Sequence, residues 1–395
     1  MNPKEQRVLW TTSTSHGLIH VYELAVPALL ILIQAEFRAD DFAMGKMVTL
    51  YGLLFGLGAL PAGYLVDRFG SKRLLLGCQW GSALCLAGMA ISPSLAWFAA
   101  CAACMGLCLS IYHPAGTALI THAMPPSGRV FAIHGMIGNL GVAGSSAIAG
   151  SLGALLGWRW ALGLLALFGI VIGLRLMALE VPDIHEVRRQ AGRGQWPGFV
   201  LLLFAAAFMG MVYRGVTTFL PKFFAVHYAE DPSTGVALGG WLVTLSLLAG
   251  LLGMYVAGRM VDRGVRPVWV FLIGGVFQTP FLVGLGTFVG PVLLPLAMSL
   301  AFFHFFTQPP GNHMVAEFTP PRLRGLGFGI YFFVTFGTGS AGASLGGWVS
   351  DQVGLSYAFP AFAAILVPSI LAILVLSRVS RVKPDPVRRA SGSAG

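Results

Sequence analysis

Long apolar stretches separated by short polar ones follow one another along almost the whole chain. A helix needs about 20 mostly apolar residues to cross the hydrocarbon core of a bilayer. In lipid, helices of this kind satisfy their own backbone hydrogen bonds, so the pattern predicts an all-α membrane protein. Twelve spans are expected, with boundaries at 9–33, 43–66, 74–92, 95–122, 130–154, 160–179, 199–221, 235–260, 268–289, 291–317, 325–349 and 355–377.

Composition supports a membrane location for this chain. Hydrophobic residues make up 56% of the 395 residues and charged residues only 10%, whereas soluble domains carry about 25% charged residues. Most of the surface must therefore face the lipid bilayer. The net charge of +10 does not indicate a nucleic-acid partner, because positive charge in a membrane protein acts mainly as an orientation signal.

The distribution of positive charge predicts the orientation. Of the 25 Lys and Arg residues, twenty lie on the same side as the N-terminus, four lie on the other side, and Arg214 lies within a span. This bias favours cytoplasmic N- and C-termini in a multi-pass inner-membrane protein. A signal peptide is not expected, because the first apolar run is long and lacks a clear small-residue cleavage site.

Glycine, proline and charged residues recur at a constant offset of 195 residues. Gly63, Asp67 and Arg68 correspond to Gly258, Asp262 and Arg263, and Pro114, Gly116 and Arg129 correspond to Pro309, Gly311 and Arg324. The repeat predicts two six-helix units with a binding site between them near the middle of the membrane. The expected parts are a first bundle at 1–179, a cytoplasmic linker at 180–198, a second bundle at 199–377 and a disordered tail at 378–395.

Between spans 2 and 3 the chain reads Gly63-Tyr-Leu-Val-Asp67-Arg68-Phe-Gly70-Ser-Lys72-Arg73, with a shorter copy from Gly258 to Arg266 between spans 8 and 9. With twelve spans, this motif resembles the signature of the major facilitator superfamily. The resemblance covers the whole chain and implies two pseudo-symmetric six-helix bundles. It also implies a gate that latches the bundles on the cytoplasmic side, built from Gly63, Asp67, Arg68, Gly70, Lys72, Gly258, Asp262 and Arg263.

A looser resemblance concerns the branch of that superfamily. His16-x-x-x-His20-x-x-Glu23-x-x-x-Pro27, Tyr112-His113-Pro114 and Arg214 are similar to the fosmidomycin-resistance type. That type implies proton-driven export of small, often anionic, inhibitors or metabolites. The Gly-Pro pair of drug antiporters is absent from span 5, and their span 4 arginine is absent too. These two differences weigh against drug export.

Span 1 carries the groups best suited to proton coupling. Of fifteen acidic residues, only Glu23 lies well inside a span, where ionisable groups are costly and usually functional. His16, His20 and Glu23 are spaced i, i+4 and i+7, so they share one helical face. We expect Glu23 to carry the proton and the histidines to relay or sense it.

Arg214 is the basic residue in mid-membrane, and its planar fork matches carboxylate, phosphate or phosphonate groups. We expect Arg214 to pair with Glu23 when the site is empty and with an anionic substrate when it is occupied. An alternative is that the pair is purely structural and fixes the register of the two halves.

Other polar residues are expected to line the cavity and contact the substrate. Pro114 and Pro309 should kink their helices beside it. The candidates are Tyr112, His113 and Thr117 in span 4, their repeat mates Thr307, Gln308 and Asn312 in span 10, and Asn139 and Tyr213.

Several patterns do not indicate enzyme chemistry. Gly337-Thr-Gly339-Ser-Ala-Gly342 has dinucleotide-motif spacing but lies inside span 11, which indicates close helix packing. The cysteines, including Cys101 and Cys104, lie in apolar runs and are interpreted as packing residues. His16 and His20 have metal-ligand spacing, yet one pair cannot fill a coordination shell. We expect no catalytic residue, no metal and no cofactor.

The sequence therefore predicts a secondary transporter that moves a small organic, anionic solute by proton-coupled alternating access, working as a monomer. The alternative is a drug:proton antiporter for apolar or cationic compounds, with Glu23 as the cation site. A sensor built on the same fold is a third hypothesis, although no long soluble signalling domain is present. The substrate and the direction of transport do not follow from the sequence.

Overall fold

The computed structural model describes residues 1–124, 128–180, 194–320 and 323–379. Most of the expected linker at 180–198 and of the expected tail at 378–395 lies outside these ranges. Within them every regular element is helical, as the hydropathy pattern predicted. The overall fold is therefore all-α.

The first eight helices span residues 3–177. They are α1 (Pro3–Ala28), α2 (Leu30–Phe37), α3 (Asp41–Phe69), α4 (Ser71–Ala90), α5 (Leu95–Ser110), α6 (Tyr112–Ala123), α7 (Gly128–Leu156) and α8 (Trp158–Met177). The next eight are α9 (Trp196–Tyr228), α10 (Pro232–Asp262), α11 (Pro267–Thr287), α12 (Leu293–Phe306), α13 (Gln308–Phe318), α14 (Arg324–Phe332), α15 (Ala341–Val353) and α16 (Ala358–Val379). A π-helical turn at Phe333–Gly337 and a 3-10 turn at Thr338–Ser340 join α14 to α15.

Ten of the described helical segments are long and apolar enough to cross a membrane, and up to eleven if the bent pair α1 and α2 counts as one span. The remaining expected span is α4, which is 20 residues long. Lys72 and Arg73 in its first turn, and Gln79 and Ser82 on its buried face, lower its hydropathy. α4 packs against α5 and α8, so each of the twelve expected spans corresponds to helix.

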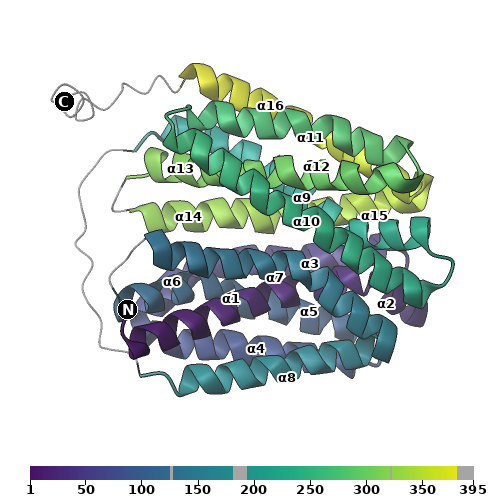
Figure 1. Cartoon of the computed structure of the whole chain (residues 1–395), viewed down its shortest axis with the longest axis horizontal. Coiled ribbons are helices and arrows are strands. Elements are labelled where there is room, and N and C mark those ends of the chain that lie inside the picture. The colour runs from purple at the N-terminus through teal and green to yellow at the C-terminus, as the bar shows by residue number, and fades with distance from the viewer. Residues whose placement is uncertain (125–127, 181–193, 321–322, 380–395) are drawn as a thin grey trace.

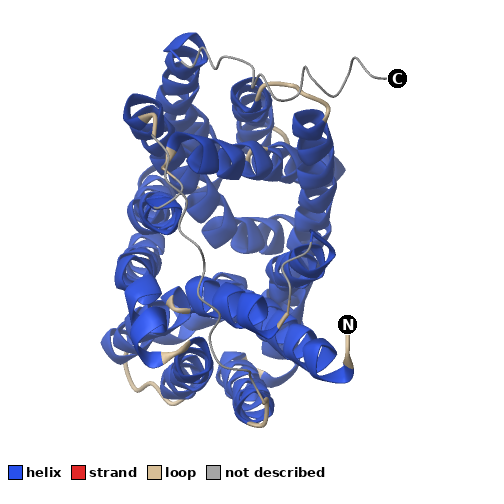
Figure 2. Ribbon diagram, turned by 90° about the vertical axis from the view of Figure 1, so that its left-hand side faces the viewer, coloured by secondary structure: helices blue, strands red, loops and turns tan. Residues whose placement is uncertain are grey.

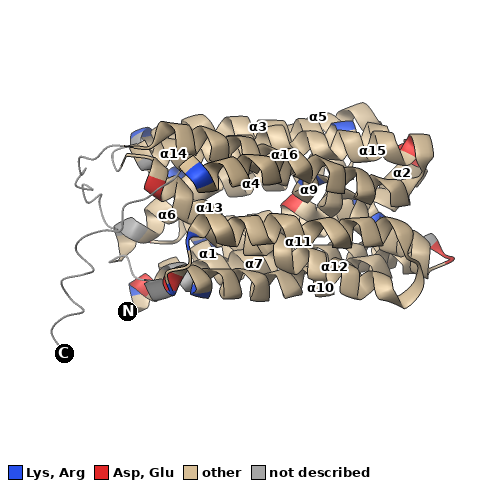
Figure 3. Cartoon of the chain, turned by 90° about the horizontal axis from the view of Figure 1, so that it is seen from above, with Lys and Arg blue, Asp and Glu red and all other residues tan. Residues whose placement is uncertain are grey.

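Two apolar cores hold the helices in two groups (Figures 1 and 2). The first core is built mainly from α1–α8 and includes Tyr22, Leu86 and Phe98. The second is built mainly from α9–α16 and includes Phe223 and Phe359. Charged residues gather mainly at the two ends of the molecule (Figure 3), which leaves long apolar sides for lipid.

The two ends of the bundle differ in what they carry. We call the end where α1 begins and α8 ends the terminal end, and the end where α2 ends and α3 begins the distal end (Figure 1). Lys4 lies 2.7 Å from Glu180 at the terminal end. There, Lys72 donates to the carbonyls of Met177 and Leu179. Lys72 therefore covers carbonyl groups that the end of α8 leaves unpaired.

Some helix boundaries differ from those expected. The first span starts at Pro3 rather than at 9 and bends by 49° between α1 and α2, around Leu29. Pro27 lies just before this bend, and a proline removes an N–H from the helical ladder and crowds the preceding turn. The seventh span starts at Trp196, inside the expected linker, because apolar residues are not required where a helix leaves the membrane.

Candidate functional site

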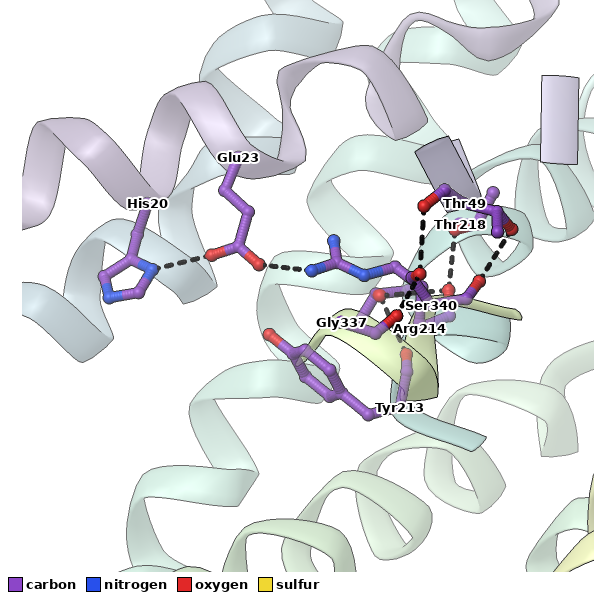
Figure 4. A network of polar contacts seen from close by, with 9 residues as sticks. His20, Glu23, Thr49, Tyr213, Arg214, Thr218, Gly337 and Ser340 are labelled. Atoms are coloured by element: carbon purple, nitrogen blue, oxygen red, sulfur yellow. Dashed lines mark hydrogen bonds and ion pairs between the residues drawn. The ribbon is translucent and has the colours of Figure 1, made fainter. Parts of the chain in front are cut away.

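The predicted polar face of α1 forms a continuous chain of contacts. His20 Nδ1 lies 2.9 Å from Glu23 Oε2, and His20 Nε2 lies 3.3 Å from His16 Nε2. The spacing i, i+4 and i+7 puts these side chains one above the other on the helix. Figure 4 shows Glu23 pointing from α1 toward Arg214, with the ring of His20 on its other side.

Glu23 meets Arg214 across the two halves. Arg214 Nη2 donates to Glu23 Oε1 at 2.7 Å, and the two side chains are only 1% and 3% exposed, respectively. Arg214 comes from α9, so the pair joins the first span to the seventh (Figure 4). The contact is the one that the sequence analysis expected for an empty site.

The guanidinium of Arg214 is only partly satisfied. Its Nε and Nη1 are buried and have no hydrogen-bond partner among the described residues. The rings of Tyr51 and Tyr213 lie 5.6 and 5.9 Å from its central carbon, close enough for cation–π attraction. Because buried donors without partners are costly, Arg214 retains capacity for a further acceptor.

A histidine cluster surrounds the start of this chain. His16 Nδ1 lies 3.0 Å from the backbone oxygen of His134, and the two imidazole rings stack at 4.4 Å. The ring of His113 lies 5.3 Å from that of His16 and 5.6 Å from that of His20. His134 comes from α7 and His113 from α6, so three helices build the cluster.

Breaks in two spans bring the repeat-related polar residues to the site. The fourth span is interrupted at Ile111, between α5 and α6, and the tenth at Thr307, between α12 and α13. Each break precedes the proline that was expected to disturb the helix, Pro114 or Pro309. Tyr112 and His113, and likewise Thr307 and Gln308, lie at these breaks.

A central cavity of about 280 Å³ separates the two groups of helices. It is lined by most of the residues that the sequence proposed for substrate and proton, together with aromatic side chains. The proposed residues that line it are His16, His20, Glu23, His113, Asn139, Tyr213, Thr307, Gln308 and Asn312.

Three proposed substrate residues lie elsewhere. Tyr112 is buried, and its hydroxyl donates to the backbone oxygen of Thr12. Thr117 lines the neighbouring cavity toward the terminal end. Arg214 lies behind Glu23 and is not among the residues that line the central cavity. The sequence placed these residues on the right spans, but helix rotation and burial decide what reaches the cavity.

The cavity also contains His304 and Tyr331, for which the sequence is equally compatible with a ligand contact and with a contact between helices. His304 stacks on Tyr213 at 5.2 Å, and His304 Nδ1 lies 2.9 Å from Gln278 Oε1. Tyr331 and Thr335 also line the wall. A glutamine inside an apolar span is a signal that could have identified Gln278, because polar side chains in spans usually have a partner.

A second cavity of about 790 Å³ lies toward the terminal end and shares His113, Phe332 and Phe336 with the central cavity. Gly63 and Tyr64 of the motif line it on one side and Gly325 lines it on the other. The second cavity therefore adjoins the central cavity on the side that faces the terminal end.

The motif residues themselves lie around this opening. A Cβ added to Gly63 or Gly258 would meet nothing within 4 Å, so neither glycine makes a close helix contact here. Gly70 has a φ of 85° and joins α3 to α4, a backbone conformation that favours glycine. Arg68, Asp262 and Arg263 are exposed, and the Asp67 side chain lies outside what the structure describes.

The distal end is closed by polar and small-residue contacts between the halves. Asp41 pairs with Lys222 of α9 and accepts from Ser350 of α15. Asp351 accepts from the backbone N–H groups of Asp41 and Phe42 at 3.1 and 2.7 Å. This cluster was not predicted, because its partners are 181 to 310 residues apart in the chain.

Glycines near this cluster allow the helices to pack closely. A Cβ on Gly45 of α3 would lie 2.3 Å from the backbone oxygen of Ala343 in α15. A Cβ on Gly342 would lie 1.9 Å from the backbone oxygen of Met211 in α9. Gly342 belongs to the dinucleotide-like spacing in span 11, so that pattern serves helix packing, as expected.

Comparisons with known proteins agree with this architecture. The family model described as Major Facilitator Superfamily matches residues 21–239 and 223–394. A D-galactonate transporter of Escherichia coli O6:H1 is 22% identical over 395 residues, covering 89% of this chain and 90% of the relative. A puromycin resistance protein of Streptomyces alboniger is 28% identical over 258 residues, covering 62% of this chain and 44% of the relative.

Solved structures show the same fold. A bacterial homolog of the human lysosomal transporter Spinster, in an inward-facing and unoccupied conformation, superimposes with a TM-score of 0.82 at 15% sequence identity. The match covers 98% of this chain and 100% of that one. At this identity the likeness concerns the arrangement of the helices.

Proposed function

This chain belongs to the Major Facilitator Superfamily, and we propose that it moves a small organic anion across the inner membrane by proton-coupled alternating access. The family and the structural neighbours are membrane transporters, so the chain is a multi-pass transporter rather than an enzyme. The proposal covers three points: the solute is an anion, its transport is coupled to protons, and the residues named below bind the two.

The observation that carries the proposal is the buried Glu23–Arg214 contact between the two halves. A carboxylate and a guanidinium out of contact with lipid and water are costly unless they pair. Their position, next to a polar cavity between two bundles, favours a working site over a purely structural pair. A group that pairs across the halves can change partner when the halves move.

Arg214 supports an anionic solute. Its unpartnered Nε and Nη1 are free donors, and the complete fork that binds carboxylate or phosphonate becomes available when Glu23 leaves Nη2. One relative bears the name of a transporter for galactonate, a sugar acid. A polyol acid of this kind would also suit the amide and hydroxyl groups of Gln308, Asn312 and Thr307, which line the same cavity.

The proposed coupling is an exchange of partners. Glu23 stands between the cavity and Arg214, so a solute carboxylate reaches Arg214 only when Glu23 swings aside. Glu23, having lost its cationic partner, then takes up a proton, because a lone carboxylate in this surrounding is strongly disfavoured. His20 lies on the cavity side of Glu23 and is the proposed route for that proton.

We place the terminal end in the cytoplasm, on the basis of the excess of Lys and Arg there. With this orientation the structure is inward-open, because the large cavity opens at the terminal end and the distal end is closed. Residues 1–179 and 199–377 are the proposed moving bundles, with 180–198 as the linker. The motif residues around Asp67, Arg68, Asp262 and Arg263 would meet when the terminal end closes.

Drug export is the second candidate. The puromycin-resistance relative and the aromatic rings around the cavity, including Tyr213, Phe305 and Phe336, favour it. In that case Glu23 would serve as the cation site. The buried guanidinium beside Glu23 would repel a cationic drug, which is the reason for preferring an anion.

Glu23→Gln tests the coupling step in proteoliposomes. We expect proton-driven accumulation to be abolished, while exchange of labelled for unlabelled solute across the membrane remains in part. Glu317→Gln, a carboxylate-to-amide change in α13, is the matched control and should keep both activities. Equal loss of accumulation and exchange in Glu23→Gln would contradict the proposed role.

The substrate class needs its own measurement. We expect sugar acids or phosphonates to raise the melting temperature of the purified protein, because a ligand that binds only the folded state stabilises it. Arg214→Ala should lose this shift. A cationic drug that stabilises both proteins, with no anion stabilising either, would favour the second candidate.

A further inference from the structure

His16, His20 and His113 form a compact cluster on one wall of the central cavity. One ring nitrogen from each residue can be chosen so that all three lie within 4.8 Å of one another. His16 and His20 come from one turn of α1, and His113 comes from the start of α6. The third ligand that the α1 pair lacks in the sequence is thus supplied by tertiary structure.

The hydrogen bonds around the cluster fix where the protons are. His16 Nδ1 faces a backbone oxygen of His134 at 3.0 Å, and a carbonyl oxygen can only accept, so this nitrogen carries a hydrogen. His20 Nδ1 faces the Glu23 carboxylate at 2.9 Å and donates to it. When both rings are neutral, each Nε2 therefore bears a lone pair.

In that state the two lone pairs lie close together. The Nε2 atoms of His16 and His20 are 3.3 Å apart, and two acceptors at that distance repel unless a positive charge lies between them. Two nitrogens bound to one tetrahedral zinc at about 2.0–2.1 Å are separated by roughly 3.3 Å. The pair already has the spacing that a shared metal ion requires.

The surroundings match the outer shell of a metal site. Metal-binding histidines usually donate their second nitrogen to a carboxylate or a backbone carbonyl, which holds the ring in place. His20 and His16 do so with Glu23 and with the His134 carbonyl, respectively. The ring nitrogens of His113 make no hydrogen bond to the described residues, so one of them can bind a metal ion without losing such a bond.

We propose that His16, His20 and His113 bind one divalent transition metal ion of the zinc class. Imidazole nitrogen suits zinc, cobalt, nickel and copper, whereas calcium and magnesium prefer oxygen. All three rings line the central cavity, so the fourth position of a tetrahedral ion faces water or a solute there. The site goes beyond the proposed transport function and does not depend on it.

Cobalt(II) is the probe, because a tetrahedral cobalt–nitrogen site absorbs visible light. The full chain would be purified in detergent with an affinity tag that contains no histidine. We expect one cobalt ion per chain with a visible band that zinc abolishes. His16→Ala, His20→Ala and His113→Ala should each weaken binding by about a hundredfold or more, since even an outer-shell change costs 10–100-fold.

His227→Ala is the matched control, because His227 lies in α9 with its Nδ1 near the backbone oxygen of Phe223 and away from the cluster. It should bind cobalt as the wild type does. Wild-type protein that shows no band with cobalt would overturn the proposal, and a proton shared by the two Nε2 atoms would then hold the contact. A folded His113→Ala variant that keeps the band at unchanged affinity would also overturn it. The measurement needs no transport, so its failure leaves the proposed function untouched.

Discussion

The two walls of the central cavity differ in their chemistry. The wall formed by α1, α6 and α7 carries His16, His20, His113 and Glu23, which can gain or lose a proton. The opposite wall carries mostly amides, hydroxyls and aromatic rings, such as those of Gln308, Asn312 and Tyr331, with His304 as its titratable side chain. Arg214 belongs to the second half but is buried behind Glu23.

We infer that the two walls have different roles, although they belong to the two copies of the same repeat. His113 corresponds to Gln308, and Thr117 to Asn312, at the offset of 195 residues. At the first of these positions, the first half has a titratable ring where the second half has a neutral amide. The first wall is suited to protons or metal ions, and the second to a hydrogen-bonding solute, with Glu23–Arg214 as the link between them.

The largest effect is expected when the Glu23–Arg214 ion pair is broken. Arg214→Ala leaves the Glu23 carboxylate buried without a cationic partner, and breaking a buried pair in this way costs roughly 3–5 kcal/mol. We expect a large loss of thermal stability in detergent. Arg214→Ala combined with Glu23→Gln should recover part of that loss, because no lone charge remains. Additive losses would show that the two residues do not act as a pair.

The next effect should separate proton handling from solute binding. His20→Ala removes the hydrogen bond to the Glu23 carboxylate, and such bonds to charged groups contribute about 1.5–3 kcal/mol. We expect proton-driven accumulation to fall by about tenfold or more. Exchange of solute across the membrane should change much less. If the affinity for the solute fell to the same extent as accumulation, the assignment of the first wall to proton handling would be wrong.

A smaller effect is expected on the opposite wall. Asn312→Ala removes an amide from the cavity, and a neutral hydrogen bond contributes about 0.5–1.5 kcal/mol. The apparent KM for the solute should therefore rise by about threefold to tenfold. The ratio of accumulated solute to the applied proton gradient should stay the same. A changed ratio with an unchanged KM would contradict the assignment of this wall to the solute.

The smallest effect is expected at the position that corresponds to Asn312 in the first half. Thr117 lines the cavity at the terminal end, and its hydroxyl donates to the carbonyl of His113 in its own helix. Thr117→Ala should change KM and accumulation by less than about twofold, because surface changes of this kind stay within about 0.5 kcal/mol. A KM effect as large as that of Asn312→Ala would show that both walls hold the solute.

Much of the fold followed from the sequence because the bilayer imposes a simple rule. Apolar length predicted all twelve helical segments, and prolines anticipated the breaks near Ile111 and Thr307. The boundaries of the first span were wrong by several residues, since helices extend beyond the lipid where apolar residues are not needed. Hydropathy alone does not identify α4 as a membrane span, because the polar residues that lower its hydropathy include some buried against neighbouring helices.

The site was only partly predictable. The face shared by His16, His20 and Glu23 follows from helical periodicity, and the pairing of Glu23 with Arg214 followed from the scarcity of charge in the membrane. The Asp41–Lys222 contact and the Gln278–His304 contact did not follow. Both depend on which helices are neighbours, and no local pattern encodes that.

By itself the sequence determined that this chain is a helical membrane protein with repeated halves and one polar face on its first span, because these features depend on local periodicity and on the cost of charge in lipid. Only the tertiary structure decided that His113 completes a cluster with His16 and His20, that Arg214 stands behind Glu23, and that the opening lies at the terminal end. These features depend on helix rotation and on packing between segments about a hundred or more residues apart, which the local sequence does not specify.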